Sequence, residues 1–197
     1  MIPATKGERT RAAILDEALR LVSRAGLDGL TIGTLAEATG MSKSGLFAHF
    51  GSREDLLLAV LAHGQAAFTK CVFQPALGEP RGIPRLRAMF TNWLDWTESA
   101  ALPGGCPMIG GAAEFDDKPG AVRDMLAGGQ RLWIETLKRA VRQAIDEGQL
   151  PEKTDPEQLA FELFGIALVV HHHRRLLGYP KARSRALAAL ERLISQK

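Results

Sequence analysis

The sequence predicts an all-α protein, with an N-terminal three-helix helix-turn-helix head followed by a helical body and about nine helices in all. Three observations lead to this fold class. Apolar residues recur at three- and four-residue steps in successive segments, which is the spacing of one helical face. Helix start and stop residues, such as Asp155-Pro156 and Gly148, separate these segments. Residues 31–53 have the pattern of a helix, a tight turn, a short helix and the start of a longer one.

Length and composition are those of an ordinary globular chain. The 197 residues suffice for one large domain or two small ones, and 46% of them are hydrophobic. Because the net charge is only +3, a nucleic-acid partner must be argued from where the charges lie. No secretory signal pattern is present, and the longest apolar run, Leu56–Ala62, is far shorter than a membrane span. We therefore expect a cytoplasmic protein with no membrane partner.

The first expected helix runs from Arg9 to Ala25 and follows an arm of residues 1–8. Its apolar residues recur on one face, and Gly26 is suited to end it. Lys6 and Arg9 lie before that face and could reach DNA phosphates, although cations near a helix start are commonly only solvated. Thr31 is suited to cap the second helix, which we expect to end near residue 39.

The turn after the second helix contains residues suited to a helix-turn-helix. Gly40 can adopt the left-handed conformation that ends a helix, and Ser42 is a good N-cap for the next one. The first residues of that next helix meet base edges in such motifs, so Ser42, Lys43, Ser44 and Gly45 are the expected groove-reading residues. The fourteen residues 40–53 include two cations and no acid. A plain helical hairpin with a polar outer face is the alternative.

A linking helix of about residues 52–74 begins the body, so the expected domains are residues 1–51 and residues 52–197. Further helices are expected at about 84–101, 108–115 and 119–147, then from Pro156, and last at 186–194. Gly128-Gly129 predicts a kink or a break in the helix 119–147. Glu114, Asp116 and Asp117 would favour the positive end of that helix, with cation binding or acid–base work as the alternative.

The segment 159–170, LAFELFGIALVV, contains one charged residue, Glu162. A helix that is apolar on all sides must be covered on more than one side, and a partner subunit is the simplest cover in a soluble chain of this size. With the last helix it would form a two-fold four-helix interface, unless both are core helices of a monomer. The expected interface residues are Leu159, Leu163, Ile166, Val170, Leu187, Leu190 and Ile194.

His171, His172 and His173 do not predict a metal site. Consecutive helical residues point about 100° apart, so three in a row cannot close on one ion. At most one of them, His171, is expected to face a pocket. We expect no metal and no cofactor. The chain also lacks the GxSxG, HExxH, phosphate-loop and dinucleotide motifs, so we expect no enzyme activity.

The two cysteines do not form a disulfide framework. Cys106 has no Lys, Arg or His within four residues to lower its pKa, so it is either a small buried hydrophobe or a thiol sensor of oxidants and electrophiles. Cys71 lies in an apolar helical segment and is expected to be structural.

The N-terminal 60 residues resemble the tetracycline-repressor (TetR) family of bacterial transcriptional regulators. The residues that carry the resemblance are ERTRAAILDEALRLVSRAGLDGLTIGTLAEATGMSKSGLFAHFGSREDLL, about a third of the chain. The family is all-helical, with a DNA-binding head and a ligand-binding, dimer-forming body. By position, the resemblance implies that Thr31 and Arg53 contact phosphates and that Phe47 and His49 lie against the DNA backbone. Position 47 is usually tyrosine, and Phe47 cannot donate the hydroxyl hydrogen bond.

The sequence and the resemblance together predict a ligand-responsive transcriptional repressor. It would bind palindromic double-stranded operator DNA as a homodimer and leave it when a hydrophobic or aromatic small molecule binds the body. The alternatives are a redox or electrophile sensor acting through Cys106, an enzyme, and a helical binding module that acts without DNA. The cysteine-proline loop resembles one that lies next to the ligand cavity in a subset of the family. The expected effector contacts, for which core packing is the alternative, are Phe90, Trp93, Trp96, Cys106, Met108, Phe115, Trp133, Leu137, Phe164 and His171.

Overall fold

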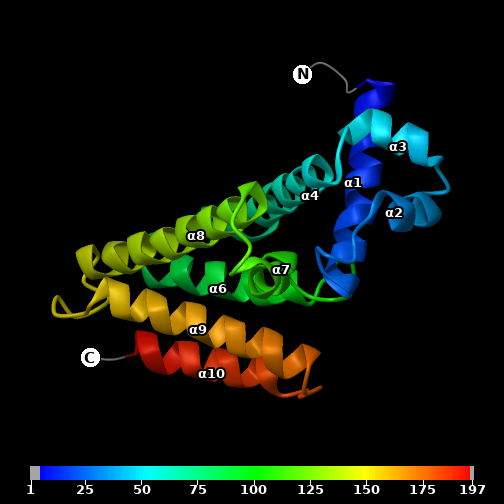
Figure 1. Cartoon of the computed structure of the whole chain (residues 1–197). Helices are drawn as coiled ribbons and strands as arrows, with labels where there is room; N and C mark the ends of the chain where they lie inside the picture. Colours follow the sequence, from blue (N-terminus) through cyan, green and yellow to red (C-terminus); the bar gives the residue numbers. More distant parts are fainter. Residues whose placement is uncertain (1–4, 196–197) are drawn as a thin grey trace. The chain divides into compact units, whose positions relative to one another are not determined.

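The structure is a computed structural model that describes residues 5–195. Within that range all regular secondary structure is helical, and nine helices contain eight or more residues (Figure 1). The all-α class predicted from the sequence is therefore confirmed. Of the predicted N-terminal arm, residues 1–4 lie outside the described range.

Helix α1 (Lys6–Ala25) begins three residues before the predicted start. Thr5 is its N-cap: the Thr5 hydroxyl accepts the Glu8 N–H at 3.2 Å, and the Glu8 carboxylate accepts the Thr5 N–H at 2.7 Å. This reciprocal pair satisfies two donors that a helix N-terminus otherwise leaves unpaired. The prediction of an irregular arm was therefore wrong for residues 5–8, and Lys6 and Arg9 lie on the first turn of a capped helix.

Helices α2 (Ile32–Thr39) and α3 (Lys43–Phe50) have the predicted bounds. Gly40 ends α2 in the left-handed conformation, with φ 66°. Leu35 of α2 and Leu46 of α3 are fully buried, so apolar contacts hold the two short helices together. Figure 1 shows α2 and α3 beside α1.

Helix α4 (Arg53–Phe68) continues through a π-helical turn (Thr69–Phe73) into the three-residue α5 (Gln74–Ala76). This run corresponds to the predicted linking helix. By length and composition alone, Arg53–Ala76 is one stretch of the described chain that could cross a membrane, a test that core helices of soluble proteins also pass. Cys71 lies in the π-helical turn and is exposed, so the prediction that it is structural was wrong.

The remaining helices are α6 (Ile83–Thr97), α7 (Pro107–Phe115), α8 (Ala121–Asp146), α9 (Pro156–Arg175) and α10 (Ala182–Ile194). Helix α8 passes through Gly128 and Gly129 without interruption, so the predicted break into two helices was wrong, and the alternative of a kink stays a prediction. Helix α9 begins as predicted, with Asp155 accepting the Glu157 and Gln158 N–H groups.

The chain forms two compact units. The first contains the described residues up to Ala67 together with Ser99–Ala127, and the second contains Phe68–Glu98 together with the described residues from Gly128 onward. Helix α7 and all of α4 except its last residue, Phe68, belong to the same compact unit as α1, α2 and α3. The predicted domain boundary between residues 51 and 52 stays a prediction.

Candidate functional site

The start of α3 presents short polar side chains to solvent. Ser42, Lys43 and Ser44 are all exposed. The Ser42 hydroxyl caps α3 by accepting the Gly45 N–H at 3.1 Å. A Cβ atom at position 45 would lie 3.1 Å from that hydroxyl oxygen, which is tight, so the glycine also has a structural reason to be there.

A positive charge lies beside the N-terminus of α2. A Cβ atom built on Gly33 would lie 4.0 Å from Lys43 Nζ and 3.5 Å from Thr31 Oγ1. The Lys43 ammonium, the positive end of the α2 dipole and an exposed hydroxyl thus converge, which is an arrangement suited to a phosphate group. Thr31 itself caps α2 by accepting the Thr34 N–H at 3.0 Å.

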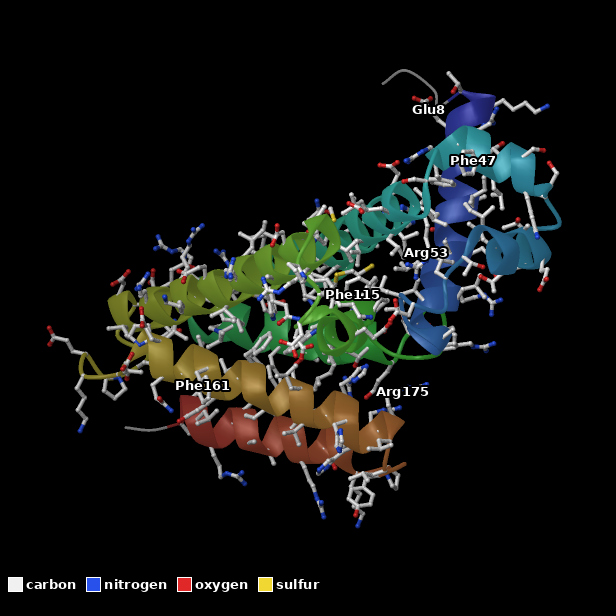
Figure 2. The ribbon with its side chains drawn as sticks, in the orientation of Figure 1. Glu8, Phe47, Arg53, Phe115, Phe161 and Arg175 are labelled. Carbon is white, nitrogen blue, oxygen red and sulfur yellow. The ribbon has the colours of Figure 1, made fainter. Side chains whose placement is uncertain are left out.

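Helix α3 also exposes an aromatic ring. Phe47 is 56% exposed (Figure 2), whereas His49 is half-buried. At the other end of the helix, the Arg11 guanidinium lies 5.2 Å from the centre of the Phe50 ring, which places the first turns of α1 beside the end of α3. Lys6 and Arg9 are exposed on those turns.

Arg53 makes contacts within the chain. Its guanidinium donates to the carbonyl oxygens of Leu27 and Leu30 at 3.0 Å each and to that of Asp28 at 3.1 Å. The predicted phosphate contact of Arg53 stays a prediction, and the structure gives this side chain a second role in holding the turn between α1 and α2.

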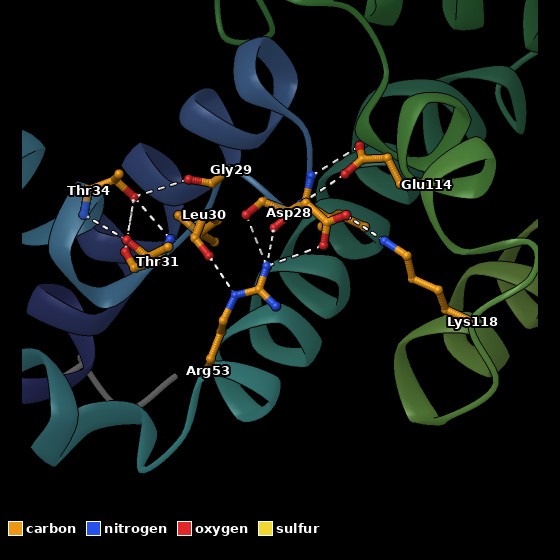
Figure 3. A network of polar contacts seen from close by, with 9 residues as sticks. Asp28, Gly29, Leu30, Thr31, Thr34, Arg53, Glu114 and Lys118 are labelled. Carbon is orange, nitrogen blue, oxygen red and sulfur yellow. Dashed lines mark hydrogen bonds and ion pairs between the residues drawn. The ribbon is translucent and has the colours of Figure 1, made fainter.

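Glu114 and Lys118 contact the same turn from another element (Figure 3). The Glu114 carboxylate accepts the N–H groups of Leu27 at 3.1 Å and Asp28 at 2.8 Å. The Lys118 ammonium donates to the Asp28 carboxylate, a hydrogen bond that lowers the pKa of Asp28 below its ordinary range. Glu114 therefore serves the end of α1, which corrects the prediction that it serves the start of α8.

Aromatic side chains of the second compact unit form one cluster, consisting of Phe68, Trp93, Trp96, Trp133 and Phe164. Phe68 meets Trp133 edge-on, with 5.0 Å between ring centres, and Trp93 stacks on Phe164 at 6.1 Å. Sequence reasoning missed Phe68, the last residue of α4, and its only signal was an aromatic residue at the end of an apolar helix. The predicted contacts Phe90, on α6, and Leu137, on α8, are fully buried, and the Phe90 ring meets Trp93 edge-on with 6.3 Å between ring centres.

Buried nitrogen atoms of this unit lack partners. Among the described residues no acceptor contacts the indole N–H of Trp96 or Trp133, although the two side chains are 7% and 8% exposed. His171 Nε2 is likewise buried and unpaired. Burial, with the charge of Arg175 and the neighbouring His172, holds the pKa of His171 below its ordinary value. An unpaired buried donor is costly, so these groups are suited to an acceptor supplied from outside the chain.

The other predicted effector contacts lie in the first compact unit. Cys106 is 3% exposed, Phe115 is 8% exposed and Met108 is half-buried, on or beside α7. The Lys118 ammonium lies 4.8 Å from the centre of the Phe115 ring. The predicted effector set is thus divided between the two units.

Most of the predicted interface residues face the interior of their own chain. Leu159, Leu163, Val170, Leu190 and Ile194 are at most 6% exposed, and Ile166 and Leu187 are half-buried. The burial of the first five corrects their assignment to the interface, because a side chain covered by its own protomer has little surface left for a partner. The assignment of Ile166 and Leu187 stays a prediction. The exposed apolar residues of α9 are Phe161 (Figure 2), Leu168 and Val169, and its C-cap, Leu176, is exposed as well.

Within residues 5–195, no three His, Cys, Asp or Glu side chains are grouped so that they could hold a metal ion.

Comparison with known proteins agrees with this architecture. Residues 14–60 match the family described as bacterial regulatory proteins, tetR family, and residues 82–190 match the tetracyclin repressor-like C-terminal domain. The chain is 36% identical over 74 residues to the HTH-type transcriptional repressor AcnR of Corynebacterium glutamicum. That match covers 38% of this chain and 39% of AcnR, so it spans about two fifths of that relative.

Two solved structures extend the similarity to almost the whole chain. A TetR transcriptional regulator from Chloroflexus aurantiacus superposes with a TM-score of 0.88 at 26% identity, covering 98% of this chain and 97% of its own. AibR, in complex with isovaleryl coenzyme A and operator DNA, has a TM-score of 0.76 at 26% identity, covering 96% and 100%. The chain belongs to the tetR family of bacterial regulatory proteins.

Proposed function

We propose that this protein is a cytoplasmic transcriptional repressor that binds a palindromic operator as a homodimer and is released by an apolar or aromatic small molecule. Members of the TetR family are transcriptional regulators, typically repressors with a ligand-binding C-terminal domain. The observation that carries the proposal is the exposed, acid-free start of α3, where Ser42 caps the helix and Lys43 and Ser44 are its first two residues.

The proposed DNA-contacting residues form two groups, one that reads base edges and one that positions the protein on the DNA backbone. Ser42, Lys43, Ser44 and Gly45 are proposed to meet base edges in the major groove. Thr31, Lys6, Arg9, Phe47, His49 and Arg53 are proposed to meet the backbone, where contacts set register and carry most of the salt dependence. The Lys43 ammonium beside the N-terminus of α2 also offers a phosphate site.

The proposed dimer uses the exposed face of α9. Phe161, Leu168 and Leu176 follow one another at steps of seven and eight residues, so they lie along one side of the helix with exposed fractions of 70%, 36% and 71%. Gly165 lies between them with no heavy atom within 4 Å of its Cβ position, which permits close approach of a second helix. Apolar side chains exposed in a row are typical of an interface.

The effector is proposed to be an apolar or aromatic molecule that carries an oxygen acceptor. The aromatic rings offer flat apolar contacts, and the indole N–H groups of Trp96 and Trp133 require an acceptor. Glu98, two residues after Trp96 in the sequence, is paired with Arg174 at 2.6 Å and with Arg183 at 3.6 Å. Its negative charge is therefore already compensated and is not available to attract a cationic effector. These features favour a carbonyl or carboxylate compound over a cation. The solved AibR complex contains an acyl thioester, which has such a carbonyl.

The alternative of a thiol sensor has less support, because Cys106 is 3% exposed and a buried thiol reacts slowly with oxidants in solution.

The proposal is tested by selecting DNA fragments from random sequence with the purified protein and sequencing them. A two-fold repeat whose binding weakens steeply with salt supports the proposal. Selection of no fragment, or binding that does not depend on salt, contradicts it.

A further inference from the structure

We infer that Glu114 of α7 is a positioning residue for the DNA-binding helices, because its carboxylate fixes the turn from which α2 starts. The inference rests on the proposed operator binding and adds a residue that contacts no DNA. It starts from the two hydrogen bonds in Figure 3, from Leu27 N–H at 3.1 Å and Asp28 N–H at 2.8 Å to the two oxygens of one carboxylate. Leu27 and Asp28 lie 87 and 86 residues before Glu114 in the sequence.

The two N–H groups belong to the residues that directly follow the C-cap of α1, Gly26. Leu27 is fully buried, so an unpaired N–H at that position would be costly. A carboxylate that accepts both donors is a charge-assisted pair, and such hydrogen bonds are about twice as strong as neutral ones. Gly26 ends α1, and Glu114 fixes the turn that follows it.

Glycines allow α7 and the preceding loop to approach α1 this closely. A Cβ atom on Gly26, whose φ is 77°, would lie 2.4 Å from a Glu114 carboxylate oxygen. A Cβ atom on Gly104 would lie 1.4 Å from the Ser23 carbonyl oxygen, and one on Gly111 would lie 2.5 Å from Leu27 Cδ1. The Gly104 N–H also donates to the Ser23 hydroxyl at 3.1 Å. Three close approaches in one place show a fitted contact, of which Glu114 is the charged part.

The same turn is held through its carbonyl groups by Arg53, at the start of α4. The N–H groups of the turn thus donate to Glu114, and its carbonyl oxygens accept hydrogen bonds from Arg53. Leu30, the last of these acceptors, is two residues before Ile32, the first residue of α2. Because α2 packs on α3 through buried side chains, a displacement of the turn would move α2 and, with it, α3, the helix proposed to read the major groove.

Helix α7 also carries Met108 and Phe115, two of the predicted effector contacts. An effector that binds more tightly when α7 is displaced would therefore also favour a displaced turn. The effector and the operator would then weaken each other's binding by the same free energy.

The test compares Glu114→Gln and Glu114→Ala with the wild type. Operator affinity is measured by fluorescence anisotropy on a DNA fragment selected by the wild-type protein, at a temperature where circular dichroism shows each variant to be folded. We expect Glu114→Ala to weaken binding about tenfold and Glu114→Gln to fall between, because an amide keeps one acceptor oxygen and loses the other. The slope of affinity against salt stays unchanged, because no phosphate contact is removed. Asp117→Asn, an exposed acid on the same segment, should bind within about twofold of the wild type.

Amide hydrogen exchange supplies a second readout. The Leu27 and Asp28 N–H groups should exchange faster in Glu114→Gln, while amides in the middle of α9 keep the wild-type rate. If Glu114→Ala does not fold, Glu114→Gln carries the test alone. Folded Glu114 variants that bind the operator like the wild type would overturn the positioning role and leave the proposed function intact. A wild-type protein that selects no DNA would instead overturn the proposed function.

Discussion

Replacing Trp133 by phenylalanine tests whether its indole N–H is truly unpaired in the folded protein. The substitution removes that N–H and keeps a six-membered ring next to Phe68 and Trp93, whose ring centres lie 5.0 and 5.9 Å from that of Trp133. Two effects oppose each other. Phenylalanine buries about 40 Å² less apolar surface, which costs about 1 kcal/mol at 25 cal/mol per Å². Removing a buried unpaired donor returns about 1–3 kcal/mol.

We therefore expect the free energy of unfolding of Trp133→Phe to lie between the wild-type value and about 2 kcal/mol above it. Trp133→Ala is the control, and it should lose about 3–5 kcal/mol because it also removes the ring contacts and leaves a cavity. Urea unfolding followed by circular dichroism measures both. A loss above about 3 kcal/mol in Trp133→Phe would show that the N–H has a partner in the folded chain, and the argument for an acceptor on the effector would fail.

The same variant should change which ligands the protein prefers. Butyrophenone and butylbenzene form a matched pair, because they share an aromatic ring and an alkyl chain but only the ketone carries an acceptor. Butyrophenone should bind the wild type about tenfold more tightly than butylbenzene, and this preference should disappear in Trp133→Phe. Calorimetric titration measures the two dissociation constants. Equal affinity of the wild type for both compounds would contradict the proposed effector chemistry.

Three further predictions follow from exposure and charge. Lys43→Ala should weaken operator binding, reduce the salt slope by about one and leave the unfolding temperature unchanged, because the side chain is exposed; an unchanged operator affinity in anisotropy titrations would remove Lys43 from the DNA contact. Phe161→Glu should yield a monomer in light scattering, whereas Leu77→Glu, at 47% exposure outside α9, should keep the dimer; a dimeric Phe161→Glu protein would exclude this face. Because burial lowers the pKa of folded His171, the unfolded chain takes up that proton first, so stability should fall as the pH decreases below about 6.5. His171→Gln should flatten this decrease and the exposed His172→Gln should not, and equal pH profiles of the two variants in thermal unfolding would contradict the assignment.

Helix positions were predictable where the signals are local. Gly40 and Ser42 each act within their own few residues, so their sequence context determines the bounds of α2 and α3. The early start of α1 was also readable, because Thr5 and Glu8 have the spacing of a capping box. The break predicted at Gly128-Gly129 failed for a different reason. Each glycine costs about 1 kcal/mol in a helix, and the buried Leu126 and Trp133 on either side outweigh that local cost.

The interface residues could not be assigned from periodicity, because α9 is apolar on nearly every side. Leu159, Leu163 and Val170 give the same sequence signal as Phe161 and Val169. Only the structure separates them, since the first three are covered by the protomer and the last two are not.

The contact of Glu114 shows a stricter limit of local reasoning. Next to Asp116 and Asp117, this residue has the sequence context of an acid before a helix, and the helix dipole gives that reading a sound physical basis. Its actual partners are the N–H groups of Leu27 and Asp28, which lie in the turn after α1, 87 and 86 residues earlier in the chain. The need for an acceptor was visible at that turn, because the N–H group of a buried turn residue must find a partner. The chain has 22 acidic residues, and the approach of α7 decides which of them accepts these hydrogen bonds. Gly104 and Gly111 permit that approach, but they do not indicate that the acceptor is Glu114. The sequence therefore shows that the turn after α1 needs a hydrogen-bond acceptor, but it does not show which residue supplies that acceptor. The substitution Glu114→Gln tests whether Glu114 does so.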